Sequence, residues 1–482
     1  MNMRISKLIK SKQLVQNNVD GNIEINNIAY DSRKVDQGDI FFAIAGFESD
    51  GHCYISDAVR NGATVIVGEK PKQSLGLANQ IPYIQVSNSR KILSRVAANY
   101  YGNPARKMKV IGVTGTDGKT TTCNLISDIL RNAGKKMGKV TTVDAIIDNT
   151  VYDMGVHVTT PDAITIQRYL YEMAQSDTEY AIIESTSHGL SQYRVNDCEF
   201  DIGVLTNITH EHFDYHGSYE AYREAKAILF NILNQNSHKN FRKFAILNAD
   251  DDSYHYMKKQ VSAECLSYGI KNRNVDLFAE NISIQEDKSS FFVVLPTGKR
   301  KLIESKLLGQ HNIYNSLAAI AVAFSQNVPF ETIKNYFLEP FSPKGRLEEI
   351  ALGQNYRVFI DYAHTENALR NILNLARKIT KNRVILLFGL SGGPRDKTKR
   401  PALGKVAIEN SDLVIITAVD WYPSEHVNDI VNQIAKGCLL SGGRLGESFW
   451  KISDREKAIE FTINMAEAGD VVIIAGKGHE KS

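Results

Sequence analysis

The sequence has few cysteines and no long apolar run. Its five cysteines, Cys53, Cys123, Cys198, Cys265 and Cys438, are dispersed. An odd, scattered set is typical of reduced thiols rather than of a disulfide framework or a zinc knuckle. No apolar run approaches the ~20 residues that a membrane-spanning helix needs. Residues 1–14 alternate basic and single apolar residues and lack the apolar core of a signal peptide. We therefore expect a cytoplasmic protein.

The chain also lacks an excess of charge of either sign. Its formal net charge is +3, and acidic and basic residues are interspersed. Such a balance does not favour nucleic acid or a membrane surface as a partner. The composition, 43% hydrophobic and 23% charged, is ordinary for a soluble globular protein, and 482 residues suggest about three domains.

The stretch from Val110 to Thr122 is the most informative part of the sequence. It predicts a buried strand, a glycine-rich turn and the start of a helix, with glycines at 112, 115 and 118. Such a turn lets backbone N–H groups and a helix N-terminus surround a phosphate chain. Lys119 would supply a charge for the outer phosphates, and the Thr120 hydroxyl would suit a magnesium ion. We predict that this loop binds a nucleoside triphosphate. Val113 stands where the generic motif has a glycine.

Short apolar runs separated by helical stretches predict an α/β fold with mostly parallel sheets. Gly102-Asn103-Pro104 marks a boundary after a small α/β unit, residues 1–104, in which Asp31–Arg33 forms a turn, 38–43 and 63–67 form strands and 55–61 a helix. A central unit, residues 105–338, contains predicted strands at 110–113, 180–183, 202–205 and 244–247. A Rossmann-like unit, residues 339–482, contains predicted strands at 358–360, 384–388, 413–417 and 471–474.

Polar residues follow the predicted strands of the central unit, where ligands of parallel sheets gather. Glu184 ends one strand, where it could bind magnesium or simply cap a helix. Three histidines lie in the segment Thr206–Gly217, which raises a zinc site as an alternative. The spacing is not His-Glu-x-x-His and no cysteine is near, so we favour a histidine beside a magnesium-bound oxygen.

Other candidate residues are ambiguous when taken alone. Lys226 lies in a predicted helix, and spacing alone predicts a solvated lysine. Asn312 and Asn315 lie where an alanine-rich helix opens, where they could read an adenine edge or cap the helix. The basic, glycine-rich segment 391–400 could hold a carboxylate or phosphate, or could be a solvated loop.

Seven motifs in order resemble the Mur ligases, and within that family the tripeptide synthetases. They are Gly-x-x-Gly-Thr-x-Gly-Lys-Thr-Thr, Glu-x-x-Ser-His, Thr-Asn-x-x-x-x-His-x-Asp-Tyr-His-Gly, Ala-Lys-x-x-Leu-Phe, Asp-Tyr-Ala-His-Thr, Arg-Asp-Lys-x-Lys-Arg-Pro and Gly-Lys-Gly-His-Glu. The resemblance covers nearly the whole chain. It implies an N-terminal UDP-binding domain, a central ATP-binding domain and a C-terminal Rossmann-like domain that binds an amino acid.

The resemblance also implies an activity. ATP would phosphorylate the γ-carboxylate of D-glutamate in UDP-MurNAc-L-Ala-D-Glu, and the amine of an amino acid would displace the phosphate, in peptidoglycan precursor synthesis. The implied cofactors are ATP and Mg²⁺, and the implied state is a monomer with small-molecule substrates. Two alternatives remain: a related ligase acting on another carboxylate, such as a pseudomurein precursor or a folylpolyglutamate-like acceptor, and a nucleotide-binding regulator without turnover.

The resemblance assigns roles to individual residues. The implied catalytic residues are Lys119, Glu184, His212 and Lys226, with Lys226 carbamoylated; Thr120, Glu184, His212 and the modified Lys226 would bind metal. The implied ATP-binding residues are Gly115, Thr116, Asp117, Gly118, Lys119, Thr120, Thr121, Asn312, Arg346, Asp361 and His364. The implied UDP-MurNAc-dipeptide residues are Ser32, Arg33, Thr159, Thr160, Thr186, Gln192 and Arg194. The implied amino-acid residues are Arg395, Asp420, Trp421, Tyr422, Gly476 and Glu480.

The sequence departs from the family pattern at several positions. Members that add diaminopimelate carry Asp-Asn-Pro-Arg, whereas this chain has Asp420-Trp-Tyr-Pro-Ser-Glu425, without the arginine that would grip a second carboxylate. We therefore favour L-lysine, L-ornithine or a similar amino acid over meso-diaminopimelate. Trp421 and Tyr422 could cover an aliphatic chain or a cation. Asp117 replaces a more usual asparagine, Glu366-Asn367 replaces a usual Pro-Asp, and Lys344 is inserted before Gly345.

Overall fold

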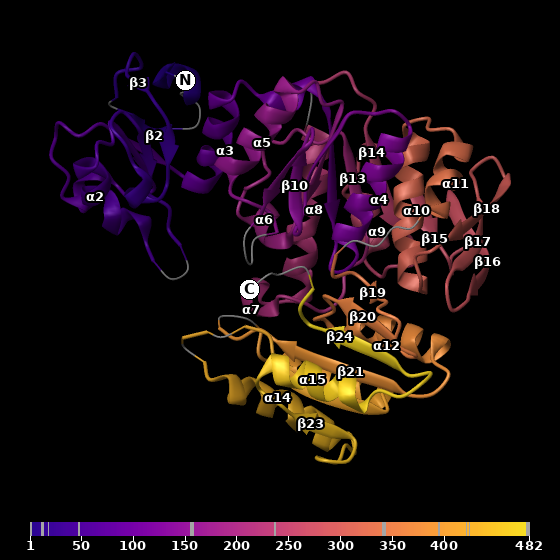
Figure 1. Ribbon diagram of the computed structural model, residues 1–482. Coiled ribbons are helices and arrows are strands. Elements are labelled where there is room, and N and C mark those ends of the chain that lie inside the picture. The colour runs from indigo at the N-terminus through magenta and orange to yellow at the C-terminus, as the bar shows by residue number, and fades with distance from the viewer. Residues whose placement is uncertain are drawn as a thin grey trace.

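The computed structural model describes residues 2–10, 14–17, 19–46, 49–154, 159–235, 238–339, 344–393, 396–420, 422–423 and 425–478. Three residues of the predicted amino-acid site, Arg395, Trp421 and Glu480, lie outside these ranges. The α/β class is confirmed. The chain builds an N-terminal, a central and a C-terminal unit, each around its own main sheet (Figure 1).

The central unit is organised around one large sheet with the strand order β11-β10-β9-β12-β8-β13-β14-β15-β16-β17-β18. Its middle strands are parallel: β9 (Met137–Val140), β12 (Tyr180–Glu184), β8 (Lys109–Thr114), β13 (Ile202–Leu205), β14 (Phe244–Asn248), β15 (Glu264–Gly269) and β16 (Leu277–Ile284). The four strands predicted from apolar runs lie here, each within one or two residues of its predicted end. The mostly parallel central sheet is therefore confirmed.

Antiparallel strands extend this sheet at both edges. They are β10 (Asp144–Ile147) and β11 (Thr150–Asp153) on one side and β17 (Ser289–Val294) and β18 (Arg300–Ser305) on the other. These strands were not predicted. They are less buried than the parallel strands: β11 has no buried residue, and β17 alternates buried and half-buried residues, so neither shows a continuously buried pattern.

Helices cover both faces of the central sheet. On one face α4 (Lys119–Asn132) and α10 (Gln310–Ser325) pack together over the sheet, with α11 (Phe330–Leu338) beside them. On the other face lie α5 (Ala163–Gln175), α6 (Ser187–Ser191), α8 (Tyr219–Gln235) and α9 (Tyr254–Lys259), and a short helix, α7 (Phe213–His216), precedes α8. Two apolar cores result, one on each side of the sheet, and they fix the ends of β8, β12 and β13 relative to one another.

The N-terminal unit has a smaller sheet in the order β2-β7-β6-β5-β4. Its strands are β2 (Leu14–Asn17), β4 (Ile28–Ala29), β5 (Ile40–Phe42), β6 (Val65–Gly68) and β7 (Tyr83–Val86); β1 (Met3–Arg4) and β3 (Glu24–Ile25) pair separately. Helices α1 (Ile5–Leu8), α2 (Ile55–Arg60) and α3 (Ser89–Tyr100) pack around it. The turn predicted at Asp31–Arg33 contains a short 3-10 helix, Ser32–Lys34, with Asp31 as its N-cap.

The C-terminal unit has the strand order β19-β20-β24-β21-β22-β23. The strands are β19 (Glu348–Ile350), β20 (Arg357–Asp361), β21 (Val384–Leu390), β22 (Leu413–Ala418), β23 (Phe449–Lys451) and β24 (Val471–Ala475). Helices α12 (Glu366–Ile379), α13 (Lys399–Asn410) and α14 (Val427–Leu440) cover one face, and α15 (Arg455–Met465) covers the other. The strands are parallel apart from β19, as a Rossmann-like unit requires.

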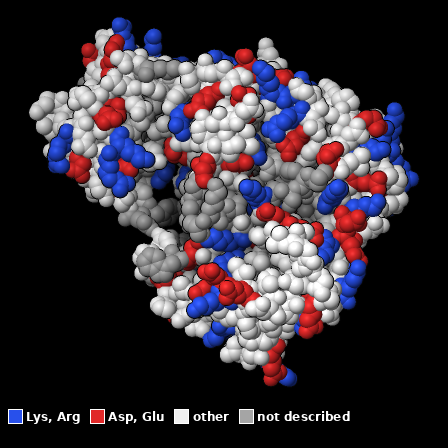
Figure 2. Space-filling view, viewed as in Figure 1, with Lys and Arg blue, Asp and Glu red and all other residues white. Residues whose placement is uncertain are grey.

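Charges of both signs are dispersed over the face of the molecule in Figure 2, in line with the balanced composition. Within the described residues, no helix combines the length and the apolar character that crossing a membrane requires.

Candidate active site

The phosphate loop joins β8 to α4 and is shaped by two glycines. Gly115 has φ +150° and Gly118 has φ +81°, a backbone region that favours glycine. A Cβ at Gly115 would also collide with the Thr206 hydroxyl. Helix α4 begins at Lys119, whose Nζ donates to the Thr116 carbonyl oxygen over 2.7 Å. The predicted order of strand, loop and helix is thus present, with the positive helix end at the lysine.

Glu184 lies at the carboxyl end of β12, beside the end of β8. Its carboxylate is buried and accepts hydrogen bonds from the Thr120 hydroxyl over 3.0 and 3.1 Å. It also accepts from the Thr142 backbone N–H and the Thr142 hydroxyl, each over 2.9 Å. The carboxylate is therefore fixed beside the first turn of α4.

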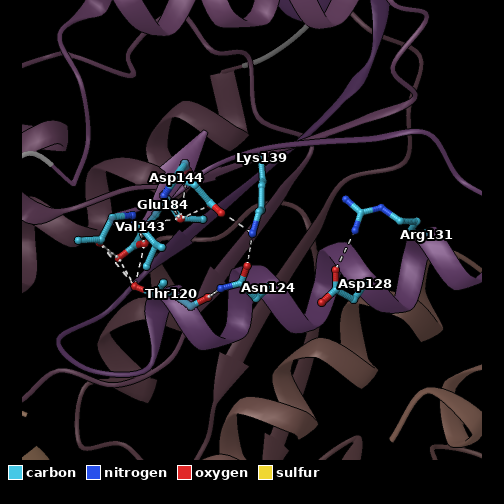
Figure 3. Close-up of polar contacts among 10 residues, drawn as sticks. Thr120, Asn124, Asp128, Arg131, Lys139, Val143, Asp144 and Glu184 are labelled. Atoms are coloured by element: carbon cyan, nitrogen blue, oxygen red, sulfur yellow. Dashed lines mark hydrogen bonds and ion pairs between the residues drawn. The ribbon is translucent and has the colours of Figure 1, made fainter. Parts of the chain in front are cut away.

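A chain of polar side chains continues from this carboxylate along one side of α4 (Figure 3). Asn124 donates to the Thr120 carbonyl oxygen over 3.0 Å and accepts a hydrogen bond from Lys139. Lys139 is buried on β9 and lies 3.2 Å from an Asp144 carboxylate oxygen. The cation of Lys139 is thus neutralised within the protein, behind Thr120 and Glu184.

Lys226 is buried, so the prediction of a solvated lysine from spacing alone was wrong. Its side chain leaves α8 towards the phosphate loop, where Nζ donates to the Gly115 carbonyl oxygen over 2.6 Å. The nitrogen also lies 4.4 Å from the centre of the Tyr222 ring. Burial, and then the nearby Lys119 ammonium, hold the pKa of Lys226 well below its usual range. A lowered pKa favours the neutral, nucleophilic amine.

The three histidines of the segment Thr206–Gly217 lie in two different places: two are near His188, and one stacks on Phe213. The rings of His212 and His216 lie 4.7 and 5.6 Å from the ring of His188, centre to centre. Burial lowers the pKa of His212, and it lowers the pKa of His188 and of His216 to about 4. His210 instead stacks on Phe213 at 3.9 Å. His212 is therefore held as a neutral imidazole, the form that binds metal ions.

Three of the side chains that line one cavity of the structure are of kinds that suit a magnesium ion. A hydroxyl at Thr120, a carboxylate at Glu184 and a neutral imidazole at His212 are few and mostly hard ligands. Magnesium keeps several waters and binds through one or two carboxylates together with substrate phosphates, so a sparse protein set fits it.

The predicted adenine residues lie on α10, opposite the phosphate loop. Asn312 donates to the Leu308 carbonyl oxygen over 2.9 Å, and Asn315 donates to the Asn312 side chain over 3.1 Å. The N-cap of α10 is Gly309, so neither asparagine is the helix cap. The Asn315 side-chain oxygen also crowds the position that a Cβ at Gly118 would occupy. Both amides therefore face the loop as fixed polar groups.

The C-terminal unit contributes Arg346, Asp361 and His364. Arg346 donates to the Thr120 hydroxyl over 3.3 Å and its guanidinium lies 4.4 Å from the Tyr362 ring centre. Asp361 accepts from the backbone N–H groups of Leu347 (2.7 Å) and Ala363 (2.8 Å), and burial raises its pKa. Arg346 thus reaches from one unit to the phosphate loop of another.

These residues surround one cavity of about 680 Å³ between the central and C-terminal units. All of the predicted catalytic and ATP-binding residues line it, although they come from distant parts of the sequence. Thr159, Thr160, Thr186 and Arg194 line it as well.

A second cavity, of about 910 Å³, lies between the N-terminal and central units. Ser32, Arg33, Gln192 and Arg194 line it, so Arg194 borders both cavities. Arg194 donates to the Thr160 carbonyl oxygen over 2.7 Å and to the Gln192 side chain over 2.7 Å. The Arg33 side chain is exposed and pairs with Asp31. The residues predicted for the muramyl substrate therefore extend from one cavity to the other.

The predicted amino-acid residues are placed apart from the first cavity. Of those that the structure describes, Asp420, Tyr422 and Gly476 do not line it. Asp420 accepts a hydrogen bond from Ser391 (3.0 Å) and lies 3.7 Å from the Lys477 ammonium. Gly476 has φ +86° and comes so close to the Gly389 carbonyl that a Cβ would not fit.

Within the described part of the basic segment, residues 391–393 and 396–400, the cations are paired with carboxylates rather than free in solvent. Arg400 is buried and donates two hydrogen bonds to Glu425, of 2.8 and 2.9 Å, and Lys397 lies 2.9 Å from the same carboxylate. These contacts, Arg400 foremost, lower the pKa of Glu425 to about 2. Lys399 pairs instead with Glu211 of the central unit over 2.7 Å; Glu211 is buried and Lys399 is half-buried. The segment binds carboxylates, but they are the protein's own.

Two residues that make the contacts described above were not predicted from the sequence. Thr142 follows β9, a parallel strand that was not predicted because its sequence, Met-Gly-Lys-Val, is not a continuous apolar run, and its place at a strand end was the only available signal. Glu425 had no signal, because its partners lie 25 to 28 residues away in another loop.

Comparison with known proteins identifies the family. The model described as Mur ligase middle domain matches residues 113–323, that of the Mur ligase glutamate ligase domain matches 345–478, and that of the Mur ligase family catalytic domain matches 24–101.

Individual relatives agree along almost the whole chain. A UDP-N-acetylmuramoyl-L-alanyl-D-glutamate–2,6-diaminopimelate ligase from Geobacillus thermodenitrificans is 38% identical over 95% of this chain and 91% of the relative. A UDP-N-acetylmuramyl-tripeptide synthetase from a Roseiflexus strain is 39% identical over 96% of this chain and 91% of the relative. A solved structure of a UDP-N-acetylmuramoyl-L-alanyl-D-glutamate–2,6-diaminopimelate ligase is 28% identical, with a TM-score of 0.68 and coverage of 100% and 94%. The chain therefore belongs to the Mur ligase family of ATP-dependent amide ligases.

Proposed function

We propose that this chain adds an amino acid to the D-glutamate γ-carboxylate of UDP-MurNAc-L-Ala-D-Glu. The observation that carries the proposal is the pair of cavities joined by Arg194. The first is lined by the phosphate loop and Lys226, and the second has the size and position to hold a nucleotide-linked substrate whose carboxylate reaches the first. The diaminopimelate ligase from Geobacillus thermodenitrificans acts, by its name, on this acceptor, and the name of the Roseiflexus relative states a muramyl tripeptide as the product.

The proposed reaction has two steps, and in the first a carboxylate must approach the anionic phosphates of ATP. A γ-carboxylate oxygen attacks the terminal phosphorus of ATP, which breaks the bond to the bridging oxygen and releases ADP. The amine of the amino acid then attacks the acyl carbon of the acyl phosphate, loses a proton and displaces phosphate. Both the carboxylate and ATP are anionic, so cationic groups must screen their approach, and the acyl phosphate must be kept from water.

Individual residues have proposed roles in this sequence. Lys119 and the N-terminus of α4 hold the phosphates, and Arg346 adds a cation at Thr120. Magnesium, held by Thr120, Glu184 and His212, would neutralise phosphate charge. Asn312 and Asp361 hold the nucleoside, and Thr159, Thr160, Thr186 and Arg194 hold the muramyl dipeptide.

We also propose that Lys226 is carbamoylated. The support is its burial and its lowered pKa, because the neutral amine is the form that adds to carbon dioxide. The product carries a carboxylate-like group in place of an ammonium and would supply another oxygen ligand beside the loop.

For the incoming amino acid we propose L-lysine, L-ornithine or a similar residue. The described cations of segment 391–400 already have carboxylate partners in Glu425 and Glu211. The Asp420 carboxylate suits an ammonium better than a second carboxylate. Diaminopimelate is the second candidate, favoured by the names of relatives 36 to 38% identical to this chain.

One assay tests both parts of the proposal. The protein is incubated with Mg²⁺, ATP and UDP-MurNAc-L-Ala-D-Glu, each amino acid is offered in turn, and the product is weighed by mass spectrometry. A mass increase equal to lysine or ornithine minus water supports the full proposal. A mass increase found only with diaminopimelate overturns the proposed preference for lysine or ornithine. The absence of product with every amino acid overturns the proposal that UDP-MurNAc-L-Ala-D-Glu is the acceptor.

A further inference from the structure

The carboxylate of Asp117 points away from the phosphate loop and into the C-terminal unit. It accepts a hydrogen bond from the Asn367 side-chain amide over 2.9 Å. It also accepts from the Thr365 hydroxyl, which lies 3.1 and 3.3 Å from the two carboxylate oxygens. These partners are about 250 residues away in the sequence. A residue of the nucleotide-binding motif is therefore bonded to another unit.

The backbone of Asp117 is hydrogen-bonded to the central unit. Its N–H donates to the Asn207 side chain over 3.0 Å, and its carbonyl oxygen accepts from the Thr206 hydroxyl (2.7 Å) and from the Asn207 amide (3.1 Å). Both residues follow β13 of the central unit. The backbone of the loop is thus held by the central unit, while the carboxylate is held by the C-terminal unit.

The N-terminus of α12 explains why this contact favours a negative charge. Thr365 is the N-cap of the helix, and its hydroxyl accepts from the Ala368 N–H over 3.1 Å while it donates to Asp117. The carboxylate therefore lies at the positive end of a helix of 14 residues. Hydrogen bonds to a charged acceptor are stronger than those between neutral groups.

The two partners form a matched pair of an amide and a carboxylate. The Asn367 amide and the Asp117 carboxylate are in direct contact. An exchange of amide and carboxylate between the two positions would keep one donor, one acceptor and one negative charge at the start of α12.

We propose that Asp117 and Asn367 are a positioning pair, which docks the C-terminal unit on the phosphate loop and thereby sets nucleotide affinity. The cavity that would hold the nucleotide is lined by both units, so any loss of docking weakens binding. In this chain the loop itself carries the negative charge, and Asn367 and Thr365 satisfy it only when the units are docked. The proposal rests on ATP binding and not on the identity of the acceptor.

A four-protein cycle tests the pair: the natural chain, Asp117→Asn, Asn367→Asp and the double variant. Asn367→Asp places two carboxylates against each other, and we expect the dissociation constant of ADP with Mg²⁺, measured by calorimetry, to rise at least tenfold. Asp117→Asn leaves two amides that can still bond, and we expect about a threefold rise. The double variant restores the pair in exchanged form, and we expect affinity within about threefold of the natural chain.

Kinetics separate a positioning role from the alternatives. We expect KM for ATP to rise in Asn367→Asp more than kcat falls, because saturating ATP restores docking.

Glu366→Gln is a matched control, since it removes an exposed charge from the same helix turn. We expect this variant to bind ADP within twofold of the natural chain. If Asn367→Asp does not fold, Asn367→Ala replaces it, with an expected severalfold loss of ADP affinity.

Two results would overturn the proposal that Asp117 and Asn367 act as a positioning pair. One is a double variant that binds ADP as weakly as Asn367→Asp, or more weakly, which would mean that the residues act separately. The other is an Asn367→Asp protein with unchanged ADP affinity. Because ADP binding is measured without acceptor or amino acid, neither result depends on the proposed reaction.

Discussion

The Lys226 ammonium nitrogen lies 2.6 Å from the carbonyl oxygen of Gly115, the residue at which the phosphate loop begins to turn. A buried helix lysine is thereby brought into the wall of the nucleotide cavity, over the Tyr222 ring and near Lys119. Burial disfavours the charged form of Lys226, and the nearby Lys119 ammonium disfavours it further, so the pKa of Lys226 is lowered.

Lys226→Ala should reduce turnover at least about 100-fold, because the site loses its proposed carbamate oxygens. Added acetate or formate should restore part of the activity by entering the space left by the side chain. Lys226→Arg keeps a cation but cannot form a carbamate, and we expect it to be inactive and not rescued. Steady-state phosphate release measures all three proteins. Full activity of Lys226→Ala without added carboxylate would rule out the carbamate role.

Thr142→Val should lower kcat about tenfold and raise the magnesium concentration needed for half activity. The variant keeps the shape of the side chain but removes the hydroxyl that donates to Glu184, and a hydrogen bond to a charged group is worth about 1.5–3 kcal/mol. Thr142→Ser retains the hydroxyl and is the matched control. A magnesium titration of activity that is identical for valine and serine variants would contradict this role for Thr142.

Glu425 should make stability depend on pH in acid. Its folded-state pKa, about 2, lies below its ordinary value of 4.5, so its contribution is complete above about pH 4.5 and is lost as the pH falls towards 2. The shift corresponds to about 3 kcal/mol at neutral pH. Glu425→Gln should therefore lower the free energy of unfolding at pH 7 and differ less from the natural chain at pH 3. Urea denaturation at both values measures this, and an equal difference at both would refute it.

Lys399→Met should destabilise the protein by about 3 kcal/mol, because it leaves Glu211 buried without a partner. Replacing both residues, in Glu211→Gln with Lys399→Met, should recover much of that loss, since no unpaired charge is then buried. Urea unfolding of the two single variants and the double variant gives the coupling energy. Additive losses would show that the residues do not stabilise the docking of the units as a pair.

The sequence predicted the parts of the fold that depend on local pattern. Strands such as β13 were found because both faces of the sheet are covered, so the strand is continuously apolar. The loop at Gly115–Thr120 was found because only glycines and a following helix satisfy its geometry. Strands β17 and β18 were not predicted, because both are only partly buried, and a half-buried strand has a weaker pattern than a continuously buried one.

The site was predictable as a set of motifs but not as a set of contacts. Nothing in its own helix distinguishes Lys226 from a solvated lysine; its burial depends on the loop after β8 that packs against it. The departures at Asp117 and Asn367 were visible in the sequence, but only their contact across two units shows that they belong together. Such pairings are made by tertiary structure.

The measurement that tests the central claim most directly is phosphate release from ATP, followed with and without each co-substrate. The account predicts sustained release only when UDP-MurNAc-L-Ala-D-Glu and an amino acid are both present, and loss of that release in Lys226→Ala. Release that proceeds at the same rate without the muramyl dipeptide would contradict it.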